Sequence, residues 1–410
     1  MLPANSLAVT ALLAALVALG PISTDLYLPS LPALARGFGA SVGEVQLTLS
    51  VFLAGFAVAQ LAYGPLSDRF GRRPVLLGGL VLYVAAGVVC ALAPSMGVLI
   101  AARGVQAVGA CAGPVLARAI VRDVHGREGA ARVLAYMAAA MALAPALGPI
   151  LGGFVELWFG WRANFVLLVL YGAAGLAAAA AFLPETNAAP DPLAARPAQI
   201  LANYRTLAGH RAYAGYVLAC AFAYSGIFAF ISGSSFVLVD GLGLAPQAYG
   251  FCFAAIVVGY MVGTLAAGRL TRRLGIDRLI AAGAAVSLLG GALLAGIAWA
   301  GIGGVGLAGA AAIVGPMMAY MVGTGLVMPN AMAGAVGPFP RLAGAASALL
   351  GFVQMTVAAG VGIAVGHLHD GTARPMATAI ALAAVLIAAS FLLLVRPARI
   401  AVTSCSRAGR

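Results

Sequence analysis

The stretch Gly64-Pro-Leu-Ser-Asp-Arg-Phe-Gly-Arg-Arg-Pro74 separates two apolar runs, at about 45–65 and 75–94. Each run approaches the ~20 apolar residues that a helix needs to cross a bilayer. Between them the chain places charged residues, prolines and glycines, which favour a turn over a continued span. The stretch therefore predicts a short polar turn at a membrane surface, joining two spanning helices.

The same alternation of apolar runs and short polar connections continues along all 410 residues. Hydrophobic residues make up 63% of the chain and charged residues only 8%, and the mean hydropathy is +1.05, whereas a soluble domain carries about a quarter charged residues. This excludes a soluble enzyme, a disordered regulator and a nucleic-acid binder, and it predicts an all-α protein embedded in the lipid bilayer. Twelve spans are expected, at about 7–29, 45–65, 75–94, 97–118, 132–155, 163–183, 212–235, 247–268, 279–299, 304–328, 342–366 and 375–395.

The placement of the basic residues, all 23 of which are Arg, supports this count. Nineteen lie in the even-numbered connections and the C-terminal tail, three lie in the odd-numbered connections, and Arg103 lies inside a span. Because connections on the cytoplasmic side carry the excess of Arg, the even-numbered side is predicted to be cytoplasmic. Both termini then lie in the cytoplasm, which agrees with an even number of spans.

The chain divides at its longest connection and repeats itself across that division. Gly64-Pro-Leu66 and Arg69-Phe-Gly71 recur as Gly268-Arg-Leu270 and Arg273-Leu-Gly275, at a constant offset of 204. Two pseudo-symmetric six-helix bundles with a central linker are features of a secondary transporter. We expect an N-terminal bundle at 1–184, a cytoplasmic linker at 185–211, a C-terminal bundle at 212–396 and a cytoplasmic tail at 397–410.

Four motifs resemble one family. Gly64–Pro74 resembles the signature loop after the second helix of the major facilitator superfamily, and Asp25-Leu-Tyr-Leu-Pro-Ser-Leu-Pro32 is similar to the first span of Bcr/CflA-type drug:proton antiporters. Arg103 with Gln106 and Gly109 resembles the superfamily's buried-arginine motif. Ala144-Pro-Ala-Leu-Gly-Pro-Ile-Leu-Gly-Gly153 resembles its antiporter motif.

This resemblance implies a proton-coupled multidrug or antibiotic efflux transporter in the bacterial inner membrane. It would work as a monomer on small amphipathic drugs, with bicyclomycin-, chloramphenicol- and florfenicol-type antibiotics as first candidates. It would need no cofactor, since protons serve as the coupling ion. Two alternatives stay open: a transporter of a small metabolite such as an amino acid or a sugar, and, more distantly, a membrane-embedded enzyme or sensor.

Asp25 and Arg103 are the expected proton-coupling residues. Asp25 is the one acidic residue well inside a predicted span, where a charged carboxylate costs about 2.5–3.5 kcal/mol and its neutral form is favoured. Arg103 cannot lose its charge, and we expect it at the same depth as Asp25. It could hold Asp25 ionised in one conformation and release it in another.

The Gly64–Pro74 stretch is expected to act as a conformational latch. Gly64 and Gly71 would permit a tight turn, and Asp68 would approach a helix N-terminus, where an anion is favoured. Arg69 and Arg72 would pair with Asp68 or with Asp123 in the next cytoplasmic connection. The latch is predicted to comprise Gly64, Asp68, Arg69, Gly71, Arg72, Arg73 and Asp123.

Two further groups complete the predicted site. Prolines that bend the fifth span and glycines that allow close contact would form a packed seam: Pro145, Gly148, Pro149, Gly152 and Gly153. Aromatic, amide and thioether side chains in aliphatic spans would contact the drug: Tyr27, Gln46, Phe52, Phe56, Tyr136, Met137, Met141, Tyr224 and Phe228.

Neither a nucleotide nor a metal is expected. The GxGxxG pattern at Gly301–Gly306 lies between two apolar runs with no strand before it. The chain has no Lys and hence no phosphate-binding GxxxxGK[ST] loop. His367 and His369 fall in a short outer connection, where we interpret them as solvated.

Overall fold

The computed structural model describes residues 3, 6–187, 197–302, 304, 306–340 and 342–397, with side chains except at 125–132, 135, 136, 138–140, 142, 197 and 199. This part of the chain is helical and contains no β-strand. Eleven of its helical segments are long and apolar enough to cross a membrane, and Leu143–Phe159 is a shorter apolar helix. Taken in order they match the twelve apolar runs, so the predicted all-α membrane fold is confirmed.

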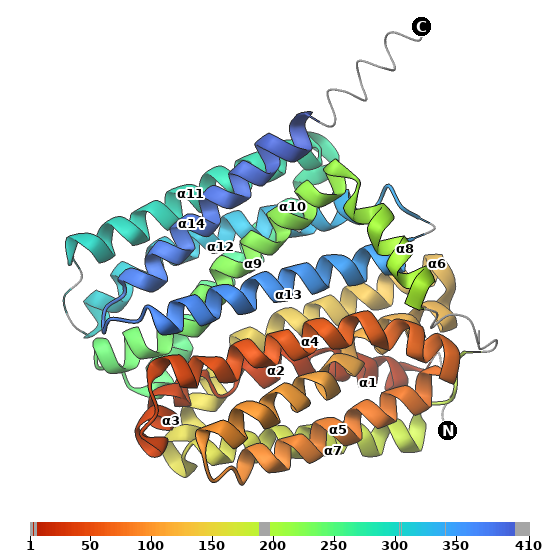
Figure 1. Cartoon of the computed structure of the whole chain (residues 1–410), viewed down its shortest axis with the longest axis horizontal. Helices are drawn as coiled ribbons and strands as arrows, with labels where there is room; N and C mark the ends of the chain where they lie inside the picture. Colours follow the sequence, from red (N-terminus) through yellow and green to blue (C-terminus); the bar gives the residue numbers. More distant parts are fainter. Residues whose placement is uncertain are drawn as a thin grey trace, which may run out of the picture. The chain divides into compact units, whose positions relative to one another are not determined.

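The chain forms two compact units, and the first comprises Met1–Arg196 together with Leu244–Ala254. Its first span is broken into four short pieces; Pro29 and Pro32, which lack an N–H, stand at the starts of the third and fourth. Figure 1 draws the helices of this unit as coiled ribbons, mostly in red to yellow-green. The elements are α1 (Leu7–Val17), α2 (Leu19–Asp25), η1 (Leu28–Ser30), α3 (Leu31–Phe38), α4 (Val42–Phe70), α5 (Arg72–Ala91), α6 (Met96–Phe159) and α7 (Trp161–Phe182).

The second unit comprises Pro197–Gly243 and Ala255–Arg410. Glycines bring its helices together: a Cβ added at Gly226 would collide with the Tyr320 ring, and one at Gly290 with the Tyr320 backbone. Its elements are α8 (Pro197–Ala208), α9 (Arg211–Ser235), η2 (Phe236–Gly241), most of α10 (Pro246–Leu274), α11 (Ile276–Ala300), α12 (Gly306–Val336), α13 (Ala343–His367), α14 (Arg374–Ser390) and η3 (Phe391–Val395). Since α8 lies within 185–211, part of the expected linker is helical. The domain boundaries given above stay a prediction.

The helix α6 supplies both the fourth and the fifth predicted spans without a break in its helical backbone. Gly113 packs against Leu16 and Gly148 packs against Asp25, both on the first span. On a straight helix the two glycines would lie ~50 Å apart, whereas Leu16 and Asp25 are only ~14 Å apart along theirs. The helix must therefore turn back between Gly113 and Gly148, which brings its second part onto the segment that carries Asp25.

The Gly64–Pro74 stretch differs from the expected loop. Because α4 continues to Phe70 and α5 begins at Arg72, Gly71 alone stands between the two helices. Gly71 has φ +95°, which strains any residue with a Cβ. Gly64 lies inside α4, where an added Cβ would meet nothing within 4 Å. The tight turn thus depends on Gly71, and the expected role of Gly64 in it was wrong.

Candidate functional site

Asp25 stands at the end of α2, directly before the break in the first span. Its side chain is 3% exposed, and Thr24 Oγ1 donates a hydrogen bond to its Oδ1 at 3.0 Å. That is the one hydrogen bond to the carboxylate within the described residues. A buried carboxylate with so little compensation for lost hydration has a strong tendency to take up a proton.

The second part of α6 lies against this segment through glycines. A Cβ at Gly148 would stand 3.2 Å from Asp25 Cβ, and one at Gly152 would collide with the carbonyl oxygen of Leu26. A Cβ at Gly153 would stand 2.6 Å from the carbonyl oxygen of Pro246, which belongs to the same unit. Pro145 and Pro149 lie on the same stretch of α6. The three glycines thus allow close packing of α6, and two of them, Gly148 and Gly152, touch the Asp25 segment.

Arg103 is fully buried on the first part of α6. Its Nη1 donates to Gln106 Oε1 at 2.7 Å, and its Nη2 donates to the backbone oxygen of Ser23 at 2.9 Å. The guanidinium also lies over the rings of Phe52 and Tyr27, 4.2 and 4.6 Å from their centroids. Cation–π contacts of this kind offset part of the cost of burying the charge.

Arg103 therefore contacts the segment that carries Asp25, but it forms no ion pair with the Asp25 carboxylate. The guanidinium reaches the backbone two residues before Asp25, and no carboxylate in the described part of the chain lies within salt-bridge distance of it. Arg103 holds the segment that carries Asp25 through the Ser23 backbone oxygen, and it does not neutralise the charge of the Asp25 carboxylate.

The expected drug contacts are not all available to a ligand. Tyr27, Phe52 and Phe228 are at most 1% exposed, and the Tyr27 hydroxyl bonds Thr48 at 2.9 Å. Gln46 is fully buried, and neither atom of its amide has a partner among the described residues. Met137 is 2% exposed, and three other side chains are half-buried: Phe56, Met141 and Tyr224. The side chain of Tyr136 lies outside the described residues.

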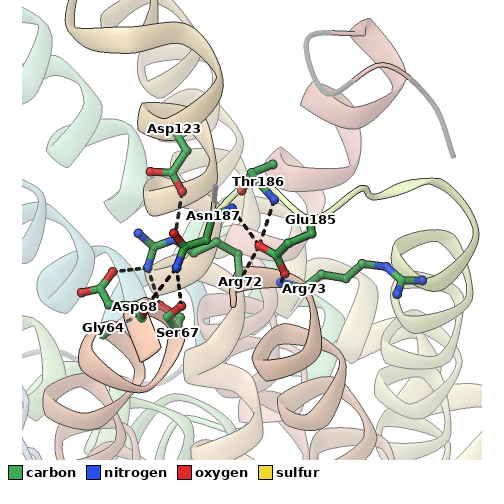
Figure 2. A network of polar contacts seen from close by, with 9 residues as sticks. All are labelled: Gly64, Ser67, Asp68, Arg72, Arg73, Asp123, Glu185, Thr186 and Asn187. Atoms are coloured by element: carbon green, nitrogen blue, oxygen red, sulfur yellow. Dashed lines mark hydrogen bonds and ion pairs between the residues drawn. The ribbon is translucent and has the colours of Figure 1, made fainter. Parts of the chain in front are cut away.

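An ionic network centred on Arg72 holds the Gly71 turn (Figure 2). Arg72 Nε donates to Asp123 Oδ2 at 2.9 Å, and its Nη1 donates to Ser67 Oγ at 2.7 Å and to Asp68 Oδ1. The Arg72 side chain is 12% exposed, so these contacts are partly shielded from water. The network joins the end of α4 to α6 across the turn, with the pairing expected for Arg72.

The other two arginines of the stretch act differently. The Arg69 guanidinium lies 4.9 Å from the centroid of the Phe70 ring and forms no ion pair within the described residues. Arg73 Nη2 donates to the backbone oxygen of Ala180 at 2.9 Å, at the end of α7. Of the three, only Arg72 links acidic side chains.

A second layer of this network comes from residues that no sequence pattern singled out. Directly after α7, Glu185 accepts the backbone N–H of Arg72 at 2.9 Å and that of Arg73 at 3.0 Å. Asn187 Nδ2 donates to the backbone oxygens of Ser67 and Asp68, at 3.3 and 3.0 Å. We call residues 185–187 the strap (Figure 2).

The strap satisfies both helix ends at the turn. Glu185 meets the unpaired N–H groups at the start of α5, and Asn187 meets two carbonyls in the last turn of α4, of which that of Ser67 also accepts the Gly71 N–H. The expectation that Asp68 approaches a helix N-terminus is corrected, because Glu185 occupies that position at α5. Partial burial favours the neutral acid, but backbone N–H donors from Asn187, Arg72, Arg73 and Thr186 outweigh it and hold the pKa of Glu185 below its usual range.

Comparison with known proteins gives a consistent result. Residues 13–363 match the family described as Major Facilitator Superfamily. The chain is 31% identical over 343 residues to Multidrug resistance protein D of Escherichia coli, covering 84% of both chains. It is 30% identical over 362 residues to the Bicyclomycin resistance protein homolog of Haemophilus influenzae, covering 87% of this chain and 88% of the other. A Chloramphenicol resistance protein of Pseudomonas aeruginosa is 31% identical over 333 residues, covering 81% and 77%.

The fold also resembles solved structures. A crystal structure of a D-xylose-proton symporter superposes with a TM-score of 0.75, covering 94% of this chain and 96% of that one. The sequence identity is 15%, so this likeness concerns the fold alone.

Proposed function

Because the chain belongs to the major facilitator superfamily, we propose that it is a proton-coupled exporter of small amphipathic drugs that works by alternating access. It is a membrane transporter and not an enzyme. It would act as a monomer in the bacterial inner membrane, with both termini in the cytoplasm and protons as the coupling ion. The N-terminal bundle at 1–184 and the C-terminal bundle at 212–396 would be the parts that move.

The buried carboxylate of Asp25 is the observation that supports proton coupling. It has one hydrogen-bond donor and no cation beside it within the described residues. Such a group takes up a proton when buried and gives it up when water or a cation reaches it. If the drug and the proton exclude each other at Asp25, each turnover moves one against the other.

Arg103 would be the group that changes the proton affinity of Asp25. It now bonds the Ser23 backbone oxygen, so a modest movement of the Asp25 segment would bring the two charges together. An adjacent guanidinium favours the ionised carboxylate and would expel the proton. The Arg72 network would act as the latch of one access state: its contacts join α4, α5 and α6 at the Gly71 turn, and they would break in the other state.

The names of relatives support the choice of substrate. Proteins about 30% identical to this chain are named for resistance to bicyclomycin, chloramphenicol and multiple drugs. These compounds are the first candidates, and a small metabolite is the alternative. The half-buried Phe56 and Met141 side chains of the first unit would offer adaptable apolar contacts, and so, in the second unit, would the half-buried Tyr224.

The test is proton movement in energised inverted vesicles on addition of chloramphenicol or bicyclomycin. We expect the wild type to release part of the proton gradient with at least one compound, Asp25→Glu to respond more weakly, and Asp25→Asn to give no response. If Asp25→Asn responds as the wild type does, Asp25 is not the coupling residue. If the wild type responds to an amino acid or a sugar instead of the drugs, the metabolite alternative holds.

A further inference from the structure

A second carboxylate lies on the same packed surface of α6, close to its end. Glu156 is half-buried and accepts a hydrogen bond from Ser30 Oγ to its Oε2 at 2.5 Å. Ser30 in turn accepts from Asn164 Nδ2 at 2.9 Å. Ser30 and Asn164 are both fully buried, and the three residues come from η1, α6 and α7. This is a polar cluster built inside a membrane protein.

The cluster continues the contact that α6 makes with the Asp25 segment. On successive turns of α6, Gly148 lies against Asp25, Gly152 against Leu26, and Glu156 against Ser30. The four-residue spacing puts these three positions on one face of the helix. Two carboxylates thus lie along one helix–helix seam, with ~12 Å of α6 between Gly148 and Glu156.

The cluster provides for both protonation states of Glu156. An ionised carboxylate accepts the hydrogen of Ser30, as observed. A protonated carboxyl group has a hydrogen to donate, and the buried Oδ1 of Asn164 has no donor within the described residues. Glu156 and Asn164 both bond Ser30 Oγ, so this hydroxyl links their two side chains. Purely structural packing would be satisfied by a neutral side chain and would not need an acid.

The charged surroundings of Glu156 are few. Arg36, on α3, is the cation whose charge acts on Glu156. The elements packed against it otherwise present the neutral Ser30 from η1 and the neutral Asn164 from α7. Asp25 lies at the far end of the seam. The charge of Arg36 favours the ionised form of Glu156, while partial burial favours the neutral acid.

We propose that Glu156 is a second proton-binding site, which takes protons from the face predicted to be external and supplies them to Asp25. An oxygen of the Glu156 carboxylate binds a proton from a hydronium ion, and the O–H bond later breaks as that proton passes to the Asp25 carboxylate. Glu156 is then an anion again, and the ~12 Å along the seam is crossed through water when that side opens. The delivery step rests on the proposed function; the proton-binding site itself does not.

Infrared titration of the full chain in lipid vesicles tests the site without any substrate. We expect the wild type to show a C=O band of a protonated carboxyl group that grows as pH falls, Glu156→Gln to lack that band, and Asp25→Asn to keep it. Glu44→Gln is the matched control. Glu44 is also a glutamate near that end of the unit, but it is exposed and caps α4 by bonding Ser41. If Glu156→Gln leaves every titrating band of the wild type in place, the proposal is overturned.

Transport assays in proteoliposomes test delivery to Asp25. Glu156→Gln should keep drug exchange in the absence of a proton gradient, because exchange needs no net proton transfer. It should lose roughly tenfold or more of gradient-driven transport, and Glu156→Asp should restore part of it. Gradient-driven transport at the wild-type rate would overturn the delivery step. A wild type that moves no protons would instead overturn the proposed function. The infrared titration would still test proton binding at Glu156, because it needs no transport.

Discussion

The internal repeat contains two helix–helix junctions, which have a similar backbone conformation but differ in the side chains that stabilise it. In the first, Gly71 joins α4 to α5 with φ +95°; in the second, Gly275 joins α10 to α11 with φ +82°. At the offset of 204, Ser67 corresponds to Thr271, but Arg72 corresponds to Ile276. The repeat has therefore kept the hinge glycine and a hydroxyl, and has kept the central cation in one copy only.

The bonds at the two junctions follow from that difference. The first is held by ion pairs of Arg72 and by the strap. At the second, Thr271 Oγ1 donates to Asn330 Oδ1 at 2.9 Å and the Tyr216 hydroxyl donates to Asp277 at 2.8 Å. The ion pairs of Arg72 weaken with salt because their charges are screened, whereas the bond between the neutral Thr271 and Asn330 side chains responds little. Among these contacts, those between two charged side chains belong to the first junction.

The largest effect is expected from Arg72→Ile, which gives the first junction the residue of the second. It leaves Asp68 and Asp123 without their partner. We expect the free energy of unfolding to fall by about 2 kcal/mol, a figure already discounted for the exposure of the two carboxylates. If the network forms in one access state only, the same energy shifts the balance of access states roughly thirtyfold. Thermal unfolding and drug-driven proton movement measure these. Arg272→Leu, at an exposed position of the second junction, is the control and should leave both unchanged. Equal effects of the two variants would remove the contrast between the junctions.

A smaller difference is expected between Gly71→Ala and Gly275→Ala. Both glycines have backbone angles that cost other residues roughly 1–3 kcal/mol. A Cβ at Gly71 would also stand 2.7 Å from Glu185 Oε2, while one at Gly275 meets nothing within 4 Å. Gly71→Ala should therefore lose about 1 kcal/mol more than Gly275→Ala in chemical unfolding. Equal losses would mean that the strap moves aside at no cost.

Acidification should loosen the strap at the first junction. Because the pKa of Glu185 is held below its usual range, the stabilisation is present above pH 4.5, the ordinary value, and is lost as pH falls through the lowered one. The effect should be about 0.5–1 kcal/mol, as for an anion at a helix N-terminus. Hydrogen exchange at the Arg72 and Arg73 amides measures it, with Glu185→Gln as the pH-insensitive reference. The same pH response in both proteins would show that another group titrates.

The smallest effect is expected from Tyr216→Phe at the second junction. It removes one hydrogen bond to Asp277 and should cost about 0.5 kcal/mol. Unlike Arg72→Ile, it should leave the salt dependence of unfolding unchanged. A stronger salt dependence in Tyr216→Phe than in the wild type would show that the second junction is ionic as well.

Much of this was predictable because membrane helices carry strong patterns. The apolar runs gave the spans, and the opposite charges of Arg72, Asp68 and Asp123 predicted their pairing. Gly71 was one of two glycines expected at the tight turn, and the sequence did not distinguish it from Gly64. The burial of Asp25 followed from its place in an apolar run.

Other parts could not be predicted, since they depend on contacts to the backbone or across long chain separations. Glu185 and Asn187 bind main-chain atoms more than a hundred positions away, and backbone acceptors leave no trace in residue identity. No sequence pattern marks Glu156, which lies near the end of a span; its polar partners Ser30 and Asn164 come from other helical segments. The partners of Arg103, an amide oxygen and a backbone oxygen, likewise depend on how the helices pack, which composition does not specify.

The strap determines where this gene could be divided. A fragment that ends at Asn187 contains all four strap hydrogen bonds to the ends of α4 and α5. A fragment that ends at Phe182 leaves those helix ends uncapped. Two co-expressed fragments of the protein should therefore assemble when the break lies after Asn187 and should fail to assemble when it lies before Leu183. As an evolutionary module, the first half reaches beyond its sixth helix and includes the first residues of the connection.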